Sequence, residues 1–264
     1  MKFLKRLLGI ILGVLLIGIG VFIFWMPRYH VVPILMYHHV DYSQHVESLQ
    51  SANVVEPDRF EWHMKYLKDH HFHVISVDDL VQGLKGKKRL PPKAVAITLD
   101  DGYEDNYTHA YPILKKYGYP AMIFLPSDLM NTTGFLTWDQ IKEMVANNID
   151  MGSHTRTHVY LPDTIIGGKA WDEIFMSKKI LEDHLAVPIK YFCYPSGGFS
   201  EEIQVMVAQA GYEAAFTTNR GASRFNKDLF ALKRLRLNTE DQLYSLWAKL
   251  SGYYNLFRRA RRPN

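Results

Sequence analysis

The sequence predicts an α/β protein in which parallel strands close into a (β/α) barrel, preceded by one N-terminal transmembrane helix. Short apolar runs alternate with amphipathic helical stretches from residue 31 to residue 250, which is typical of a parallel sheet. Residue types that carry chemistry follow several of these runs, at the strand ends where such barrels build their sites. The segment Leu7–Met26 is an uncharged apolar run of 20 residues, about the length that crosses a bilayer.

The N-terminal segment is predicted to be an uncleaved membrane anchor. Lys2, Lys5 and Arg6 precede the apolar run, which favours a cytoplasmic N-terminus and a remainder outside the cytoplasm, at the cell membrane. The alternative is a cleaved signal peptide, whose apolar region is shorter and is followed by small residues. Here the run ends in the bulky sequence Phe24–Tyr29 instead. A buried core helix is a weaker alternative, because the segment is apolar on all sides.

Strands are predicted where short apolar runs are rich in β-branched and aromatic residues. The predicted strands are Val31–Tyr37, Val74–Val77, Ala94–Leu99, Ala121–Leu125, Ile149–Ser153, Ile189–Tyr194, Tyr212–Thr218 and Leu232–Leu237. Several of them end at aspartate or histidine. An irregular barrel is therefore favoured over an open doubly wound sheet, because a barrel gathers those ends on one face.

Helices are predicted between the strands where apolar residues recur three or four positions apart, as Phe60, Met64 and Leu67 do. Gly118 ends one of them, because glycine readily adopts the left-handed conformation that closes a helix. The predicted helices are Pro57–His70, Asp78–Leu84, Tyr107–Tyr117, Trp138–Asn147, Lys169–His184, Glu201–Ala210 and Glu240–Leu250.

Composition and charge exclude several classes of protein. With 47% hydrophobic and 22% charged residues among 264, the chain is predicted to fold rather than to be disordered. Its single cysteine, Cys193, allows no intramolecular disulfide and no cysteine-rich zinc site. No G-x-G-x-x-G or P-loop motif follows a strand, so nucleotide binding is not expected.

The formal charge of +4 is concentrated at the two ends of the chain, neither of which carries an acid. Removing the seven terminal basic residues leaves −3 for the rest, so nucleic-acid binding is not expected either. These residues are Lys2, Lys5, Arg6, Arg258, Arg259, Arg261 and Arg262.

Two motifs point to metal-dependent hydrolysis. Thr98–Tyr103 contains the pair Asp100-Asp101, and Ser153–His158 contains two histidines four positions apart. A His₂-Asp set leaves one position of a zinc ion open for water, which is the catalytic pattern. One aspartate can then bind metal while the other acts as a base. Taken alone, such aspartates are often a turn or helix cap and such histidines lie on surfaces, but their joint position at strand ends favours a site.

These two motifs resemble those of the polysaccharide deacetylases, the NodB-homology domain of carbohydrate esterase family 4. The resemblance covers residues 31–237 and implies a distorted (β/α) barrel that removes acetyl groups from glycans, usually from N-acetylglucosamine. It implies that Asp101, His154 and His158 bind one divalent metal ion, with zinc as the expected metal. It also implies that Asp100 is the general base.

The third motif departs from the family pattern, in which arginine precedes Pro-Tyr. The aligned residues here are Cys193-Tyr194-Pro195-Ser196, so the arginine that usually orients the base is missing. We expect Tyr194, Pro195 and Ser196 to contact the substrate or the oxyanion, the latter through the N–H of Ser196. Arg234, near the end of the last predicted strand, is expected to orient the base instead.

The general acid also departs from most members, which use a late histidine. No histidine follows His184 here. Pro33–His39 resembles the start of the poly-N-acetylglucosamine deacetylases, a subgroup with circularly permuted motifs and an early histidine as acid. The matching residue is His38. Because side chains alternate along a strand, His39 is expected to point away and to be structural.

Together these expectations describe a membrane-anchored, extracytoplasmic hydrolase that removes N-acetyl groups from a cell-surface polysaccharide. Its expected partners are an acetylated glycan and the membrane. The alternatives are an O-acetyl xylan-type esterase and a non-catalytic glycan-binding module. The predicted organisation is a cytoplasmic start and anchor over 1–28, a catalytic domain over 29–238, and a C-terminal helix with a basic tail over 239–264.

Overall fold

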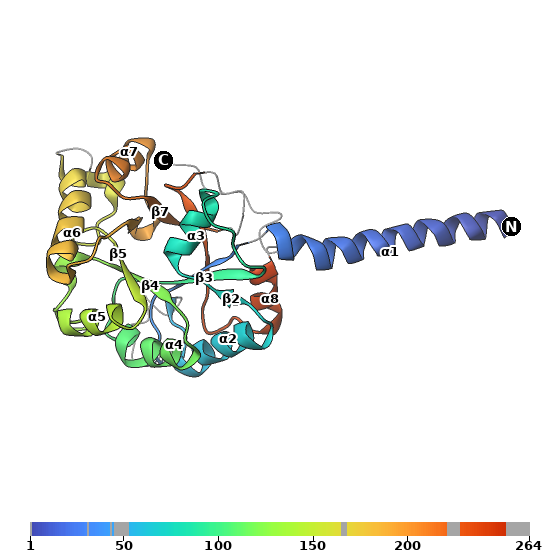
Figure 1. The fold of residues 1–264 in the computed structure, drawn as a ribbon, viewed down its shortest axis with the longest axis horizontal. Coiled ribbons are helices and arrows are strands. Elements are labelled where there is room, and N and C mark those ends of the chain that lie inside the picture. Colours follow the sequence, from blue (N-terminus) through green and yellow to red (C-terminus); the bar gives the residue numbers. More distant parts are fainter. Residues whose placement is uncertain are drawn as a thin grey trace.

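The computed structural model describes residues 2–30, 32–42, 44, 53–164, 168–220 and 228–251. Helices surround a central parallel sheet, and the N-terminal helix α1 projects away from this body (Figure 1).

Seven parallel strands form a closed ring at the centre of the molecule. The ring closes because β1 pairs with β3 on one side and with β8 on the other. An eighth, two-residue strand, β2 (His73–Val74), pairs with the first two residues of β3. The predicted barrel is therefore confirmed, and an open doubly wound sheet is excluded. The ring strands are β1 (Ile34–Tyr37), β3 (Ala94–Asp100), β4 (Ala121–Leu125), β5 (Ile149–Ser153), β6 (Tyr191–Cys193), β7 (Ala214–Arg220) and β8 (Leu232–Arg236).

The helices lie close to their predicted positions. They are α2 (Pro57–Asp69), α3 (Val77–Leu84), α4 (Tyr111–Tyr117), α5 (Trp138–Val145), α6 (Lys169–Leu185), α7 (Glu201–Gln209) and α8 (Leu243–Ser251). The predicted helix over 107–117 instead begins with a π-helical turn, Asn106–Ala110. The predicted strand over 74–77 ends early, because the Ser76 hydroxyl accepts a hydrogen bond from the Asp79 N–H and so caps α3.

Each barrel strand sends alternate side chains inward and outward. On β3, Ala94 and Ala96 belong to the inner cluster, whereas Val95, Ile97 and Leu99 pack outward against the helices. Thr98 and Asp100 continue the inward face toward the end of the strand. This alternation decides which residue of each predicted motif can reach the centre of the barrel.

The N-terminal helix α1 (Lys2–His30) includes the segment for which a transmembrane helix was predicted. Many of its apolar side chains are exposed, including Ile10, Val14 and Ile17. In the part of the chain that the structure describes, no helix combines the length and the apolar character that a membrane span requires. The helix is confirmed, and its assignment as a membrane span is not supported.

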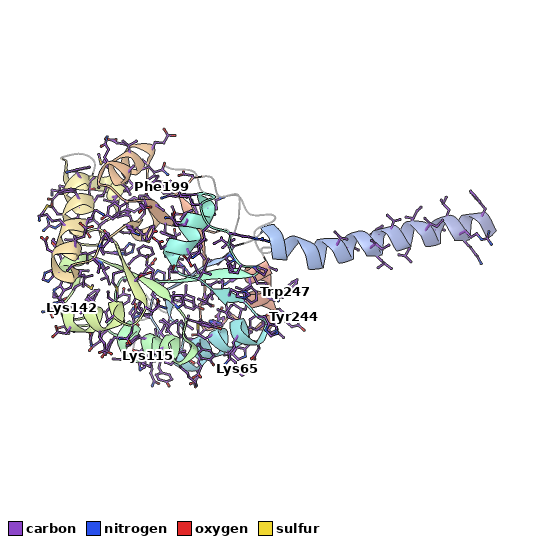
Figure 2. The ribbon with its side chains drawn as sticks, viewed as in Figure 1. Lys65, Lys115, Lys142, Phe199, Tyr244 and Trp247 are labelled. Carbon is purple, nitrogen blue, oxygen red and sulfur yellow. The ribbon has the colours of Figure 1, made fainter. Side chains whose placement is uncertain are left out.

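The C-terminal helix α8 packs on the barrel through Leu246 and Leu250, which are buried. Its outer side carries Tyr244 and Trp247 (Figure 2), which are 83% and 45% exposed. The arginines of the predicted basic tail, residues 258–262, lie outside the described residues.

Candidate active site

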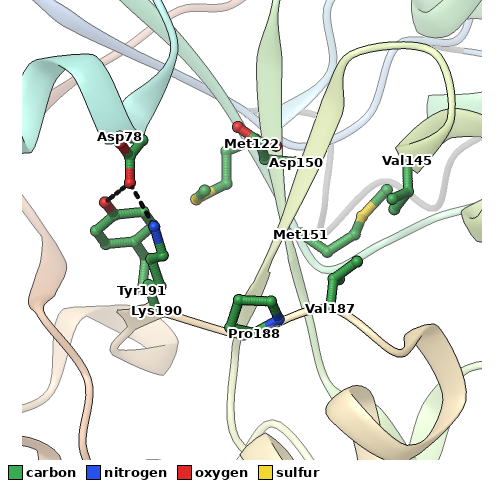
Figure 3. Close-up of a pocket in the computed structure, with 9 residues that line it drawn as sticks. All are labelled: Asp78, Met122, Val145, Asp150, Met151, Val187, Pro188, Lys190 and Tyr191. Atoms are coloured by element: carbon green, nitrogen blue, oxygen red, sulfur yellow. Dashed lines mark hydrogen bonds and ion pairs between the residues drawn. The ribbon is translucent and has the colours of Figure 1, made fainter.

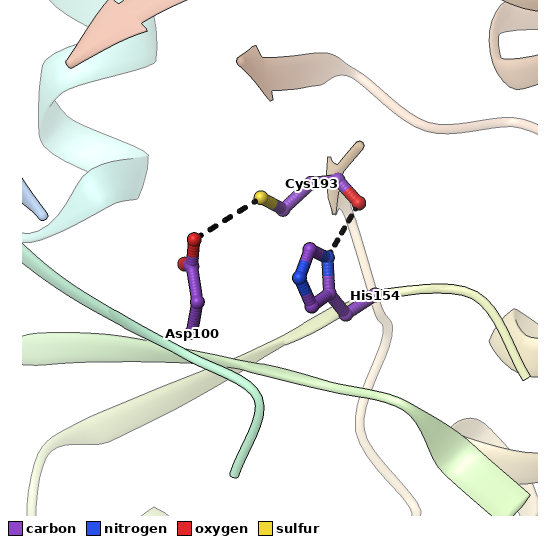
Figure 4. A group of neighbouring side chains, drawn as sticks. All are labelled: Asp100, His154 and Cys193. Atoms are coloured by element: carbon purple, nitrogen blue, oxygen red, sulfur yellow. Dashed lines mark hydrogen bonds between the residues drawn. The ribbon is translucent and has the colours of Figure 1, made fainter. Parts of the chain in front are cut away.

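The C-terminal ends of the barrel strands bring most of the predicted site residues together. Asp100 is the last residue of β3, His38 follows β1, and His154 follows β5. Figure 4 shows Asp100, His154 and Cys193 facing one another at the ends of β3, β5 and β6. Asp100 and His154 are 2% exposed, so the charges here lie in a largely desolvated environment.

Asp101, His154 and His158 converge on one point. The Nε2 atoms of His154 and His158 lie 3.3 and 3.1 Å from the same oxygen of Asp101, Oδ1. All three ligand atoms lie within 4.8 Å of one another. The backbone of Asp101 is left-handed, with φ +75°, and Gly102 continues the turn at φ +65°. This turn aims the Asp101 carboxylate away from the inward direction of Asp100.

The donor set fits a divalent cation. Asp101 Oδ1 is buried and has no hydrogen-bond partner among the described residues, although two imidazoles face it. The Nδ1–H of His154 donates to the carbonyl oxygen of Cys193 at 2.7 Å, so Nε2 presents its lone pair toward Asp101. Histidines that bind a metal are usually oriented in this way, by a hydrogen bond from the other ring nitrogen to a carbonyl oxygen. Burial raises the pKa of Asp101, but the two imidazoles outweigh burial and hold it well below its ordinary value.

Asp100 forms a bidentate ion pair with Arg234. Both guanidinium–carboxylate contacts are 2.6 Å, and the Arg234 side chain is fully buried. Arg234 also donates to the Thr217 carbonyl and to the Thr98 hydroxyl, each at 3.1 Å. Burial opposes ionisation of Asp100, but the charge and hydrogen bonds of Arg234 outweigh it, so the pKa of Asp100 lies below its ordinary value. The structure therefore presents Asp100 as an ionised, oriented carboxylate.

Cys193 stands where the family pattern has arginine, and its thiol lies beside the ion pair. Its Sγ accepts a hydrogen bond from Arg234 at 3.0 Å and lies 3.7 Å from Asp100 Oδ2. The guanidinium that meets Asp100 thus comes from β8 rather than from β6. Burial raises the pKa of the Cys193 thiol, so it stays protonated.

His38 and His39 point to opposite sides of β1, as the alternation of a strand predicts. The Nε2 atom of His38 lies 3.9 Å from Asp100 Oδ2, inside the barrel. His39 instead donates from Nδ1 to Asp105 at 2.6 Å and stacks on the Tyr103 ring, with centroids 3.6 Å apart. Burial lowers the pKa of His38, although the neighbouring Asp100 partly opposes this.

The chain is similar to several known proteins. The family model for polysaccharide deacetylases matches residues 87–215. The putative polysaccharide deacetylase YxkH of Bacillus subtilis (strain 168) is 34% identical over 209 residues, which cover 78% of this chain and 71% of the relative. The chain belongs to the polysaccharide deacetylase family.

Two further proteins are similar to this deacetylase. The poly-β-1,6-N-acetyl-D-glucosamine N-deacetylase of Staphylococcus aureus (strain MSSA476) is 25% identical over 218 residues, covering 76% of this chain and 73% of the relative. The Streptococcus pyogenes deacetylase PplD, solved in complex with acetate, superposes with a TM-score of 0.75 at 28% identity. The superposition covers 84% of this deacetylase and 99% of PplD.

Only part of the third motif lies near the candidate site. The Tyr194 side chain points outward from the barrel, where it is buried, and its hydroxyl donates to the Phe230 carbonyl at 3.0 Å. Its ring therefore does not reach the site. Ser196 is exposed just beyond the end of β6 and has a left-handed backbone, with φ +53°. Pro195 is buried beside it.

Two residues that support the His38 segment of this deacetylase were not predicted from the sequence. Asp105 accepts a hydrogen bond from the Val40 N–H at 3.0 Å, and Asn106 Nδ2 donates to the His38 carbonyl at 2.8 Å. They fix the chain around His38. The sequence shows that they lie a few residues after Asp100-Asp101, but this position does not reveal that they contact the chain after β1.

A separate hollow of about 280 Å³ lies at the other end of the barrel, near the N-terminal ends of β4, β5 and β6 (Figure 3). It contains none of the predicted site residues. Asp78 in this hollow accepts hydrogen bonds from Lys190 at 2.9 Å and from Tyr191 at 2.8 Å. The candidate site is the barrel end that carries Asp100, because the predicted residues converge there.

Proposed function

We propose that this protein removes N-acetyl groups from a cell-surface polysaccharide that contains N-acetylglucosamine. One observation carries the proposal. A buried carboxylate, Asp100, is held by Arg234 directly beside the converging ligand atoms of Asp101, His154 and His158. A fixed base next to three metal ligands is the arrangement that hydrolysis of an acetyl group needs.

The metal proposed for this site is zinc, held by Asp101, His154 and His158. A divalent ion bound there supplies Lewis acidity, which lowers the pKa of water and polarises a carbonyl. Asp100 is the base that takes a proton from the attacking water. Arg234 binds both oxygens of Asp100, so the carboxylate is held in one orientation.

His38 is the proposed general acid. An amide nitrogen leaves only when it is protonated, so the N-acetyl reaction needs a proton donor near the scissile bond. The His38 ring lies inside the barrel beside Asp100, and its Nδ1 is buried without a hydrogen-bond partner in the described part of the chain. The N–H of Ser196 is the proposed donor to the oxyanion. The reaction consumes one water and yields acetate and a free amine.

The proposed general acid, His38, favours N-acetyl over O-acetyl substrates. An alcohol leaves more readily than an amine, so an esterase depends less on a group such as His38. The Staphylococcus aureus relative, named as an N-deacetylase, supports the same choice.

The test is acetate release from an N-acetylglucosamine oligomer and from an O-acetylated xylan, with metal content measured on the same sample. We expect release from the oligomer, with zinc bound. The Asp100→Asn variant should keep its metal and lose turnover by roughly 10² to 10⁴. Release from xylan alone would indicate an esterase. Metal-loaded protein that binds glycan without releasing acetate would indicate a binding module.

We further propose that the protein works outside the cytoplasm, at the cell membrane. The support is the order of basic and then apolar residues before residue 27, together with a polymeric cell-surface substrate. Cell fractionation with a high-salt wash, and protease treatment of intact cells, test this location. A shortened protein in the medium, or full-length protein that protease cannot reach, would contradict it.

A further inference from the structure

The loop between the two histidine ligands has to reverse its direction. His154 and His158 are four residues apart, yet their Nε2 atoms reach the same oxygen of Asp101. The reversal uses left-handed backbone at Thr155, with φ +66°, and at His158, with φ +60°. Each such residue costs roughly 1 to 2 kcal/mol when it is not glycine. The loop therefore needs contacts that hold it in this conformation.

Glu173, on the first turns of α6, supplies three of these contacts. Its Oε2 atom accepts hydrogen bonds from the backbone N–H groups of Arg156 and Thr157, at 2.9 and 3.0 Å. Its Oε1 atom accepts one from the Thr157 hydroxyl at 2.8 Å. Hydrogen bonds to an ionised acceptor are stronger than neutral ones. Glu173 is half-buried, which limits competition from water.

The other contacts of the loop act at different points. The Thr155 hydroxyl accepts from the His158 N–H at 3.0 Å, within the loop itself. The Arg156 side chain pairs with Asp128 at 2.8 Å and with Asp172 at 2.5 Å. These two pairs are partly exposed and bind only the Arg156 side chain. The carbonyl oxygens of Thr155 and Arg156 accept hydrogen bonds from the N–H groups of Ser127 and Asp128, at 3.1 and 2.9 Å, and that of Thr155 also accepts one from the Ser177 hydroxyl at 2.8 Å. Glu173 instead binds the backbone N–H groups of the two residues directly before His158.

We propose that Glu173 is a positioning residue for the metal site. It fixes the loop so that the His158 imidazole is already aimed at Asp101 before a metal binds. This inference rests on the proposed metal site at Asp101, His154 and His158. Without Glu173, part of the binding free energy would be spent on ordering the loop, so affinity falls while the rest of the fold is unaffected.

The test compares Glu173→Ala with Asp172→Ala, its neighbour on the same helix turn, in the full-length chain. Zinc affinity is measured by competition with a chelating dye, and the Tm of the metal-free proteins is measured beside it. We expect Glu173→Ala to raise the zinc Kd by roughly 10- to 100-fold, the usual effect of removing a residue that orients metal ligands. Asp172→Ala removes only a side-chain pair and should leave the Kd within about threefold.

Glu173→Gln covers the case in which Glu173→Ala does not fold. Its amide oxygen can still accept from the two backbone N–H groups without the negative charge, so its Kd should lie between the other two. Zinc Kd values for Glu173→Ala and Glu173→Gln that equal the wild-type value would overturn the inference. A lower metal-free Tm at unchanged Kd would show a structural role only. A wild-type protein that binds no zinc would instead overturn the metal site itself.

Discussion

Asp100 and Arg234 depend on each other, because both are buried and oppositely charged. Removing one partner of a buried ion pair leaves an uncompensated charge in a desolvated site. Arg234 contacts both Asp100 oxygens and three further groups, which are the Thr217 carbonyl, the Thr98 hydroxyl and the Cys193 thiol.

We expect Arg234→Met to lower the free energy of unfolding by roughly 3 to 5 kcal/mol. It should also abolish turnover, because Asp100 would be protonated or misplaced. Urea unfolding at pH 7 measures the first effect. Arg156→Met is the control, since Arg156 also pairs with two carboxylates but is about a third exposed. It should cost about 0 to 1 kcal/mol. Equal losses in the two variants would contradict the role given to Arg234.

The two adjacent histidines that follow β1 should respond differently to the same substitution. His38→Ala should lower turnover by roughly 10² to 10⁴ while the metal content stays normal. His39→Ala should act through stability, because His39 bonds to Asp105 and stacks on Tyr103 outside the barrel. Acetate release, metal analysis and Tm distinguish the two. Normal turnover in His38→Ala would remove it from the mechanism.

Among the elements, α2, β1 and α8 are joined by a buried polar chain around His63. The His63 Nε2–H donates to the Asp241 carbonyl at 3.1 Å, and its Nδ1 accepts from the Tyr37 hydroxyl at 3.2 Å. Asp241 in turn binds Lys249 of α8 at 2.6 Å. Burial is the main cause that lowers the pKa of His63, to about 4.

His63 should make the fold sensitive to mild acid. The folded state keeps His63 neutral, whereas the unfolded chain takes up a proton below about pH 6.5. The contribution of neutral His63 to the free energy of unfolding is therefore fully present above pH 6.5 and is lost as the pH falls toward 4. The stability difference between wild type and His63→Gln should shrink by about 2 kcal/mol between pH 7 and pH 5. A difference that stays constant over this range would contradict the assignment.

For the whole molecule, the proposed metal site would connect separate parts of the barrel. Asp101 follows β3, whereas His154 and His158 follow β5, so an ion bound by all three would link the ends of these two strands. A ligand that binds only the folded state stabilises it by an amount that grows with the logarithm of the ligand concentration. Stability should therefore report metal occupancy independently of turnover.

Zinc at 100 times its Kd should stabilise the fold by about 2.7 kcal/mol, or roughly 5 to 10 °C in Tm for a chain of this size. A chelator should reverse the shift. The double variant Asp101→Asn/His158→Ala should show no shift, because two of three ligands are gone. Differential scanning calorimetry measures all three samples. A shift of the same size in the double variant would place the zinc elsewhere.

The sequence by itself determined the barrel class and the position of most elements. Hydrophobic periodicity is a local property, so runs such as Ala121–Leu125 and Ile149–Ser153 became strands with the predicted bounds. Spacing also determined the grouping of Asp100, Asp101, His154 and His158, since parallel strand ends meet on one face. The alternation of side chains that continues past β1 also predicted that His38 and His39 point to opposite sides.

Only the tertiary structure decided which distant residues complete the site. Arg234 lies 134 positions from Asp100, and the closure of β1 onto both β3 and β8 brings them together. The same holds for Glu173 on the histidine loop and for Asn106 on the His38 carbonyl. Local patterns of residues carry no information on such pairings, because contacts between distant segments depend on strand order, register and the direction of each side chain.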